Sequence, residues 1–508
     1  MDRANSAEED RSKRGADFLG LRIDQAPPGA MSGWLADRIR AAVRDRRLRT
    51  GDRLPASRTL AGDLGVSRGV ITEAYRRLVD DGVVVAGGRA GTVVAGCTVP
   101  TTPVAGARST DPRRPTTSPD PPSADVFAGP PRGDVFTALR AAPARVDLSP
   151  GVPDLTAFPR AAWLRAERSV LHDLTPDAFG YGDPAGAPRF RGAVAGWLAR
   201  YRGITVDPAG IMVVAGVAQG LALLCRVLGR RGISTIGVED PGSLGARRQL
   251  QDWGMSTVGV AVDDAGLRVE ALRATGAPAV LVSPAHQFPM GVVLDGARRR
   301  ELTDWAADGG LVIEDDYDAE HRYDRPPVTA LHAALPDRVC YTGSVSKILA
   351  PALRVGWLIP PGWLLDEVVV AKQEADLGNP VLAQLVLAEL MESGQLERHL
   401  RMIRRRHRRR RDAMIGALAR HLPGATVHGT AAGLHLTITI DDPIEDTALA
   451  AAALAAGVKV QPLSWHRIDP GPAGLVLGYA ACSAGEIEQG LAVLGAVLAR
   501  TNAARLIG

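Results

Sequence analysis

A long stretch that is poor in large apolar side chains divides this chain in two. Residues 96–145 are rich in Pro, Thr, Ser and Gly. Such a segment cannot bury enough surface to offset its chain entropy, and its prolines favour an extended spacer, so we predict a linker. The 508 residues also exceed what one compact core holds. We therefore predict a flexible leader over residues 1–30, a small domain over residues 31–95 and a large domain over residues 146–508.

The distribution of charge separates the two predicted domains. The whole chain has a formal net charge of +4, whereas residues 31–92 alone carry twelve arginines against seven acidic residues. A small basic module beside a large, nearly neutral one indicates a polyanion partner for the small module.

Composition also argues against several classes of protein. Hydrophobic residues make up 46% of the chain, and no apolar run approaches the roughly 20 residues that span a bilayer. The four cysteines are scattered and the histidines lack metal-ligand spacing, so we expect no disulfide framework and no metal site. The polar N-terminus lacks a signal-peptide core, so we expect a cytoplasmic protein.

The small domain has the pattern of a winged helix-turn-helix. Apolar residues over 33–45 share one helical face, and Ser57 is a candidate N-cap for a helix that Gly65 ends. Ser67 is a candidate cap for a second helix over residues 68–80, and a two-stranded wing turns at residues 87–91. The start of such a second helix reads base edges in the major groove, and a wing arginine contacts the DNA backbone or minor groove. The expected DNA-contacting residues are Arg68, Gly69, Thr72 and, at the wing tip, Arg89.

The large domain alternates apolar strands with amphipathic helices, which predicts a mostly parallel α/β sheet. The strand segments are GIMVVAG, ISTIGVED, PAVLVSP, GLVIEDD and VCYTGSVS. We predict a large subdomain over about residues 170–385. A smaller α+β subdomain over about residues 386–508 contains GLHLTITI and GLVLGYA.

Lys347 follows one of these strands, in a region where lysine is sparse among many arginines. A lysine amine of this kind can form a Schiff base with pyridoxal 5'-phosphate (PLP). Ser344, Ser346 and Arg354 are close enough in sequence to bind the phosphate, as are the first amides of a helix near Val217 and Ala218. A second strand ends in Glu314, Asp315, Asp316 and Tyr317, where a carboxylate could hold the pyridine nitrogen protonated.

The small domain closely resembles the GntR family of winged-helix regulators, through the stretch GDRLPASRTLAGDLGVSRGVITEAYRRLVDDG and the glycine-rich wing. The resemblance implies DNA contacts at Arg58, Ser67, Arg68, Thr72 and Gly91.

Residues 146–500 resemble fold-type I aminotransferases, specifically the MocR/GabR group, in which these are fused to a GntR head. The matching segments include YGDPAGAPRFRGAVAGWLARYRG, VEDPG, SPAHQFPMGVVL and CYTGSVSKILAPALRVGW. The resemblance implies that Lys347 forms the Schiff base with PLP, Asp315 pairs with the pyridine nitrogen and Tyr317 with the phenolate oxygen, although Asp316 stays an alternative to Asp315. Arg354 and Ser344 would hold the phosphate. His286 would lie beneath the ring, and Tyr181 would reach the cofactor of the neighbouring subunit.

Three positions depart from the aminotransferase pattern. Ser243 stands where many relatives have an aromatic residue, Phe288 where aminotransferases have an asparagine, and Val476 where they have the arginine that binds a substrate carboxylate. Losing that arginine removes a bidentate, charge-assisted contact, which favours ligand sensing over turnover. The arginine run Arg404–Arg411 is expected to be a solvated helix face of the small subdomain rather than a second nucleic-acid surface.

The sequence therefore predicts a PLP-dependent transcription regulator. It would act as a homodimer on double-stranded DNA with paired half-sites, and sense PLP, a small amine or an amino acid. Two alternatives stay open. One is an active aminotransferase with an accessory DNA-binding head, and the other is a repressor that uses a PLP-free scaffold to dimerise.

Overall fold

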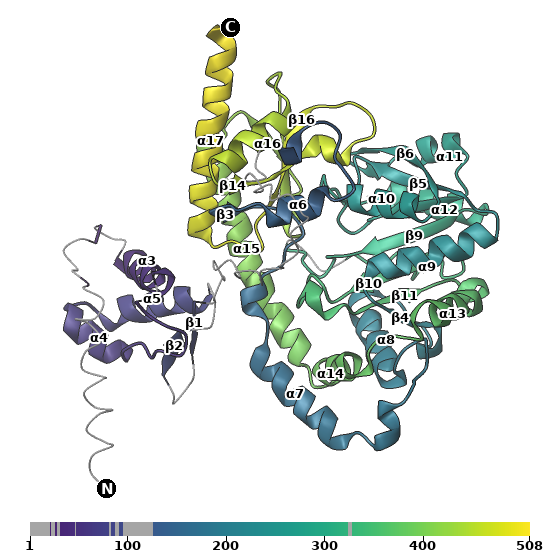
Figure 1. Cartoon of the computed structure of the whole chain (residues 1–508), viewed down its shortest axis with the longest axis horizontal. Coiled ribbons are helices and arrows are strands. Elements are labelled where there is room, and N and C mark those ends of the chain that lie inside the picture. The colour runs from purple at the N-terminus through teal and green to yellow at the C-terminus, as the bar shows by residue number, and fades with distance from the viewer. Residues whose placement is uncertain are drawn as a thin grey trace, which may run out of the picture. The chain divides into compact units, whose positions relative to one another are not determined.

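The chain forms two compact units, Met1–Ser118 and Pro119–Gly508. The structure, a computed structural model, describes residues 21, 26–27, 31–45, 47–80, 83–86, 91–94, 125–323 and 328–507. Figure 1 shows the elements of both units.

The N-terminal unit is a three-helix core followed by a hairpin. Its elements are α3 (Met31–Arg44), α4 (Ser57–Leu64), α5 (Arg68–Asp80), β1 (Val84–Ala86) and β2 (Thr92–Val94), and the two strands are antiparallel. Helix α4 ends because Gly65 adopts a left-handed conformation at φ 63°, which glycine tolerates without a steric penalty. The core includes Leu35, Ile39, Leu60, Ile71 and Leu78.

The predicted helix-turn-helix is confirmed, with one correction at the start of α4. Ser57 is the first residue of that helix, and the N-cap is Ala56, which makes no side-chain capping bond. The hydroxyl of Ser57 instead accepts a hydrogen bond of 3.4 Å from the Arg68 guanidinium. The predicted wing tip at residues 87–90, including Arg89, lies outside the described residues.

The C-terminal unit contains an eight-stranded sheet in the order β4-β11-β10-β9-β8-β5-β6-β7. The central strands β10, β9, β8, β5 and β6 are parallel to one another, as predicted. The strands are β4 (Met212–Val214), β5 (Thr235–Asp240), β6 (Ser256–Asp263), β7 (Gly266–Leu267), β8 (Ala279–Val282), β9 (Leu311–Asp316), β10 (Val339–Ser344) and β11 (Gly356–Ile359).

Helices cover both faces of this sheet. On one face, α9 (Val217–Arg230), α10 (Leu244–Asp252) and α13 (Gly362–Asp376) share a core with Met212 and Val214. On the other face lie α8 (Pro188–Arg202), α11 (Val269–Thr275) and α12 (Gly296–Ala307), whose cores include Val213 and Val312. Alternate residues of a strand thus face opposite layers, as the pleat requires.

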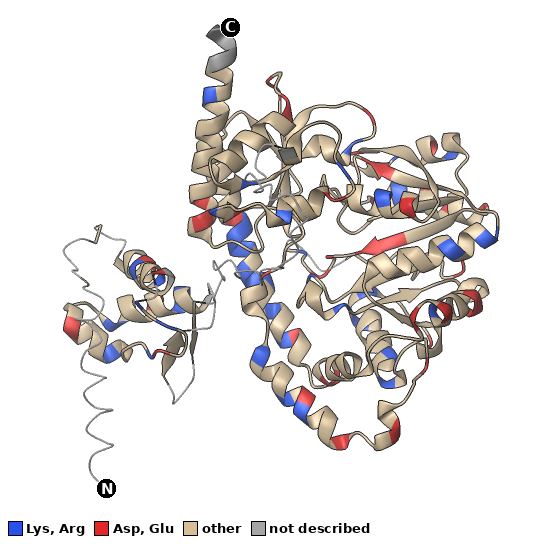
Figure 2. Cartoon of the chain, in the orientation of Figure 1, with Lys and Arg blue, Asp and Glu red and all other residues tan. Residues whose placement is uncertain are grey.

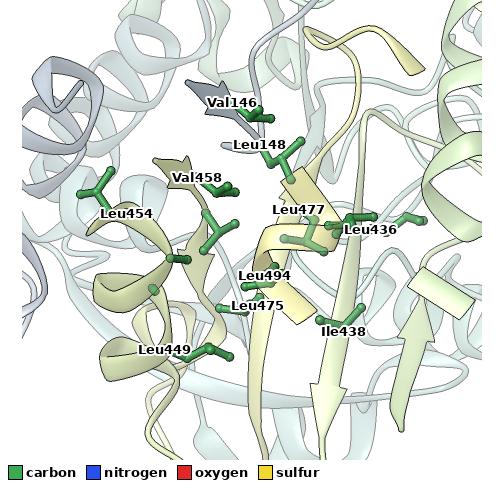
Figure 3. Packing of buried hydrophobic residues seen from close by; sticks show 14 of the residues in the cluster. Val146, Leu148, Leu436, Ile438, Leu449, Leu454, Val458, Leu475, Leu477 and Leu494 are labelled. Carbon is green, nitrogen blue, oxygen red and sulfur yellow. The ribbon is translucent and has the colours of Figure 1, made fainter. Parts of the chain in front are cut away.

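A smaller antiparallel sheet, in the order β12-β13-β16-β15, forms the second part of this unit. Its strands are β12 (Ala425–His428), β13 (His435–Ile440), β15 (Gln461–Pro462) and β16 (Ala473–Gly478). The helices α15 (Gln395–His421), α16 (Asp446–Ala455) and α17 (Ala484–Ile507) contribute buried residues to its core. The same core holds Val146 and Leu148, because β3 (Val146–Asp147) pairs with β14 (Val458–Lys459) (Figure 3).

The predicted linker is too long at its C-terminal end. Residues 125–145 contain a short 3-10 helix (η3, Asp125–Phe127) and α6 (Val135–Ala141), not a spacer. Phe127, Val135 and Leu139 are buried in the core of the smaller sheet, and Phe127 stacks on Trp465 with ring centroids 5.3 Å apart. The apolar surface that these side chains bury offsets the conformational entropy that this segment loses when it becomes ordered.

Candidate cofactor and DNA-binding sites

Lys347 lies just after β10, with its amine among buried groups. The side-chain Nζ donates a hydrogen bond of 2.6 Å to the carbonyl oxygen of Gly151. Burial lowers the pKa of the Lys347 amine, while Asp318 and Asp315 nearby act in the opposite direction. A lowered pKa increases the fraction of uncharged amine, which is the nucleophilic form.

The end of β9 separates two adjacent carboxylates. Asp316 points into the protein, where it pairs with Arg202 at 2.5 Å and accepts a hydrogen bond from the Tyr341 hydroxyl. Asp315 pairs in register with Thr342 of the neighbouring β10 and lies within the electrostatic range of Lys347. Burial, with the nearby Asp316 and Asp318 charges, raises the pKa of Asp315 to about 7. A nearby cation would stabilise the ionised form of this carboxyl group, and a protonated pyridine nitrogen is such a cation.

Tyr317 follows directly, and its hydroxyl lies 3.0 Å from Nδ1 of His286. His286 comes from the loop after β8 and is fully buried, so two chain segments meet around the Tyr317 hydroxyl. Phe288 packs edge-on against the Tyr317 ring, with centroids 6.4 Å apart. The arrangement presents a phenol hydroxyl on the same side of β9 as Asp315, because alternate residues of an extended chain share a face.

Five residues form what we call the anion cradle: Gly216, Val217, Ala218, Ser344 and Arg354. Gly216 precedes α9 with φ 83° and provides no side-chain cap, so the helix begins with bare backbone amides at Val217 and Ala218. The Arg354 guanidinium lies 3.0 Å from where a Cβ of Gly216 would be, and it donates to the carbonyl of Ala215. A helix N-terminus beside a guanidinium is suited to bind a phosphate.

The remaining predicted cofactor residues have simpler surroundings. The Ser346 amide donates to the Ser344 hydroxyl at 3.4 Å, which ties these two serines together. Tyr181 is 96% exposed and therefore contributes nothing to the buried cluster of its own chain. That exposure leaves its ring available to another molecule.

The three departures from the aminotransferase pattern have defined structural roles. Ser243 caps α10, accepting a hydrogen bond of 3.2 Å from the Ala246 amide. Phe288 packs against His435 and His466, with ring centroids 4.9 and 5.0 Å apart. Val476 is completely buried in β16 opposite Thr437 of β13. Position 476 thus carries a buried side chain without charge.

The expected DNA-contacting residues of the N-terminal unit are exposed. They are Arg58, Ser67, Arg68, Gly69 and Thr72, at the starts of α4 and α5. Gly91, directly before β2, has φ 80°, which favours glycine. Nearer the C-terminal end of α5, Arg76 and Arg77 pair with Glu73. The exposed Arg68, Gly69 and Thr72 lie at the N-terminal end of α5, where recognition helices contact bases.

The prediction that Arg404–Arg411 forms a simple solvated face is wrong for part of the run. Basic residues recur along α15 (Figure 2). Arg406 and Arg410 are buried and pair with the buried Asp154 at 3.1 and 2.9 Å. Arg410 also donates to the carbonyl of Ala480. These two arginines hold the segment before α7 (Arg160–Asp173) against α15, because a buried charge requires a partner.

Sequence reasoning missed Gly151 and Asp318, which both bear on the Lys347 amine. Gly151 is 196 residues distant in sequence, and no local pattern links it to Lys347. Asp318 belongs to the same acidic cluster EDDYD, but alternation along an extended chain would place it with Asp316, on the face opposite Asp315, so no local pattern indicated that it lies near Lys347. No helix of the described residues is long and apolar enough to cross a membrane.

Comparisons with known proteins agree with this geometry. Residues 33–94 match the bacterial regulatory proteins of the gntR family, and residues 145–494 match aminotransferase class I and II. The chain is 32% identical to the HTH-type pyridoxine biosynthesis transcriptional regulator PdxR of Corynebacterium glutamicum, over 91% of this chain and 94% of that protein. It is 30% identical to the probable rhizopine catabolism regulatory protein MocR of Rhizobium meliloti, over 93% of this chain and 94% of that protein.

Solved structures extend the likeness to the fold of the C-terminal unit. The kynurenine aminotransferase of Pyrococcus horikoshii is 26% identical, with a TM-score of 0.67, over 72% of this chain and 94% of that protein. The helix-turn-helix, the sheet that carries Lys347 and these relatives lead to one conclusion. The chain belongs to the MocR- and PdxR-type transcription regulators, in which a gntR-family DNA-binding domain is joined to an aminotransferase class I and II domain.

Proposed function

We propose that this regulator binds PLP covalently through Lys347 and that PLP, a small amine or an amino acid at this site changes its binding to DNA. The observation that carries the proposal is the amine of Lys347, whose pKa burial lowers, beside the Asp315 carboxyl, whose pKa is raised to about 7. Catalytic and cofactor-binding groups characteristically have shifted pKa values of this kind.

The residues present fit the cofactor at each of its polar groups. Asp315 would pair with the pyridine nitrogen and Tyr317 with the phenolate oxygen, while His286 would lie beneath the ring. Arg354, Ser344, Ser346 and the amides of Val217 and Ala218 would bind the phosphate. Tyr181 of a second subunit would complete the phosphate site in a homodimer. When bound, PLP supplies an electrophilic carbonyl carbon and an electron-accepting ring.

The site favours sensing over turnover. Val476 offers no charge to a substrate carboxylate, which removes the bidentate recognition that orients an amino acid. The name of the Corynebacterium relative, a regulator of pyridoxine biosynthesis, supports PLP itself as a ligand that is sensed. Any such ligand regulates only if it binds two arrangements of the protein with different affinity.

The DNA partner would be a duplex with paired half-sites. The exposed starts of α4 and α5 carry Arg58 and Arg68, and a homodimer presents two such surfaces. Half-sites separated by whole helical turns of DNA would then match the two-fold arrangement of the protein.

Reconstitution of the full chain with PLP tests the proposal. We expect a near-visible absorbance band that borohydride reduction traps on the protein, and a change of at least several-fold in affinity for a selected DNA site. Lys347→Ala should abolish both. Lys459→Ala removes a buried lysine that is paired with Asp147 instead, and should leave both unchanged.

A wild-type protein without this band would contradict the proposal and favour the PLP-free scaffold. Sustained turnover of amino acids and keto acids would favour the aminotransferase alternative. The two outcomes are separate, because one is read from the cofactor spectrum and the other from product formation.

A further inference from the structure

A buried hydrogen-bond network lies behind Tyr317. Nδ1 of His286 is 3.0 Å from the Tyr317 hydroxyl and 3.0 Å from Oδ2 of Asp318. The His286 and Asp318 side chains are almost completely buried. Nδ1 of His286 is therefore shared between the Tyr317 hydroxyl and the Asp318 carboxyl group, away from solvent.

The surroundings indicate which nitrogen of His286 carries the proton. Asp318 as a carboxylate can only accept, so Nδ1 is the donor to it. Nε2 of His286 is buried without a hydrogen-bond partner among the described residues. At the buried Nε2, an unpaired lone pair costs less free energy than an unpaired N–H group. The proton of the neutral imidazole is therefore expected on Nδ1.

Glycines hold the His286 ring in position. Gly433 has φ 84°, and a Cβ there would overlap the His286 ring. A Cβ on Gly291, at φ 69°, would lie 3.0 Å from Nε2. Backbone thus packs directly against the imidazole on this side, so the ring has little freedom to turn away from Tyr317.

We propose that His286 and Asp318 are positioning residues that hold the Tyr317 hydroxyl for the cofactor and set its charge environment. This inference rests on the proposed function. His286 fixes the phenol oxygen, and the Asp318 charge, which also acts on Lys347, favours a protonated nitrogen where Lys347 joins the cofactor.

His286, Asp318 and His435 lie close enough to resemble a metal site, with ligand atoms within 4.8 Å of one another. The hydrogen bonds argue for a network instead. Nδ1 of His286 is already shared between two oxygens, and Nε2 of His435 lies 3.0 Å from the carbonyl oxygen of Pro289, which can only accept.

The charged and titratable groups around Tyr317 come from five segments of the chain. Asp315 and Asp318 flank it on its own segment, Glu239 belongs to β5, Lys347 follows β10, and the pair His286 and His435 come from the β8 loop and β13. Burial lowers the pKa of His435 to about 3, so it is neutral near pH 7. Asp318 is thus one of three carboxyl groups whose charge bears on the phenol.

The test is a pH titration of the near-visible band of the full chain reconstituted with PLP. Asp318→Asn keeps the shape and removes the charge, and should lower the pKa of the band by about one unit. In the wild type, Tyr317→Phe should shift the pKa of the band. In a protein that already carries His286→Ala, the same substitution should shift this pKa at least threefold less, because the two residues act together. His286→Asn, whose amide mimics Nδ1, should restore the full Tyr317→Phe shift.

His332→Asn is the matched control, because His332 is a buried histidine whose Nδ1 bonds to the carbonyl of Val339 instead. It should leave the band pKa unchanged. An unchanged band pKa in Asp318→Asn, or an equal Tyr317→Phe shift with and without His286, would overturn the network while the wild-type band still supports the proposed function. A wild type without any band would overturn the proposed function itself.

Discussion

Asp315 and Asp316 are neighbours in sequence with opposite surroundings. Asp316 is stabilised by Arg202 and Tyr341, whereas Asp315 accepts a long hydrogen bond of 3.5 Å from Thr342 and lies near other carboxylates, which the charge of Lys347 offsets in part. The protein thus keeps one carboxyl group in an unfavourable environment where a cofactor would approach. A site prepared for a cationic partner costs stability while that partner is absent.

This cost predicts how Asp315→Asn changes stability. Because the folded-state pKa of Asp315 is about 7, above the ordinary value of 3.8 in an unfolded chain, the protein loses stability progressively as pH rises from about 4 to 7, and the loss is complete above pH 7. Without PLP, Asp315→Asn should therefore raise the free energy of unfolding by about 2–3 kcal/mol more at pH 8 than at pH 5. Urea unfolding at both pH values measures this.

The neighbouring substitution is the control. Asp316→Asn leaves the Arg202 charge buried without its partner, and should lower the free energy of unfolding by about 3 kcal/mol at both pH values. Equal destabilisation by both substitutions at pH 8 would show that Asp315 is not held in an unfavourable state.

At the scale of elements, short sequence patterns predicted the helices and strands whose bounds depend on nearby residues. Ser67 and Gly65 bracket the turn, and α5 spans the predicted residues 68–80. The apolar segments of the sequence predicted β4, β5, β8, β9 and β10, because strands that are buried on both faces are continuous apolar runs. Long-range packing carried no local signal. Phe127 and the salt bridges of Asp154 to Arg406 and Arg410 depend on partners more than 200 residues away.

The candidate site divides in the same way. Lys347, Asp315 and Tyr317 follow strands whose carboxyl ends meet at one edge of the sheet, so sequence order alone could group them. Which of Asp315 and Asp316 faces Lys347 depended on Arg202, which lies on α8 and is 114 residues from Asp316. The role of Asp318 depended on the ring of His286, whose orientation no local pattern encodes.

The docking of η3 and α6 gives a prediction for these elements. Phe127 is buried against Trp465, so Phe127→Ala should lower the free energy of unfolding of the C-terminal unit by about 3 kcal/mol. Urea unfolding followed by tryptophan fluorescence measures it. Val126→Ala, at a half-buried neighbour, should cost much less. No loss of stability in Phe127→Ala would mean that residues 125–145 behave as the linker that their composition suggests.

At the scale of the whole molecule, positive charge has two unequal uses. In the N-terminal unit, exposed arginines stand at the starts of α4 and α5, as binding to a polyanion requires. In the C-terminal unit, Arg406 and Arg410 neutralise Asp154 inside the protein. Arg406 and Arg410 of the arginine-rich helix α15 therefore have a structural role, and we expect the DNA-binding charge to belong to the smaller unit.

Two arginine variants separate these uses. Arg68→Ala removes a guanidinium at the start of the recognition helix, and should weaken binding to a selected operator by about 1–3 kcal/mol, or roughly 5- to 160-fold. Arg408→Ala removes an exposed arginine of α15, and should leave both the affinity and its dependence on salt unchanged. Fluorescence anisotropy with labelled DNA at several salt concentrations measures both quantities. If Arg408→Ala instead reduced the salt dependence, α15 would contact phosphates, since each lost contact flattens the slope of log affinity against log salt by about 0.9.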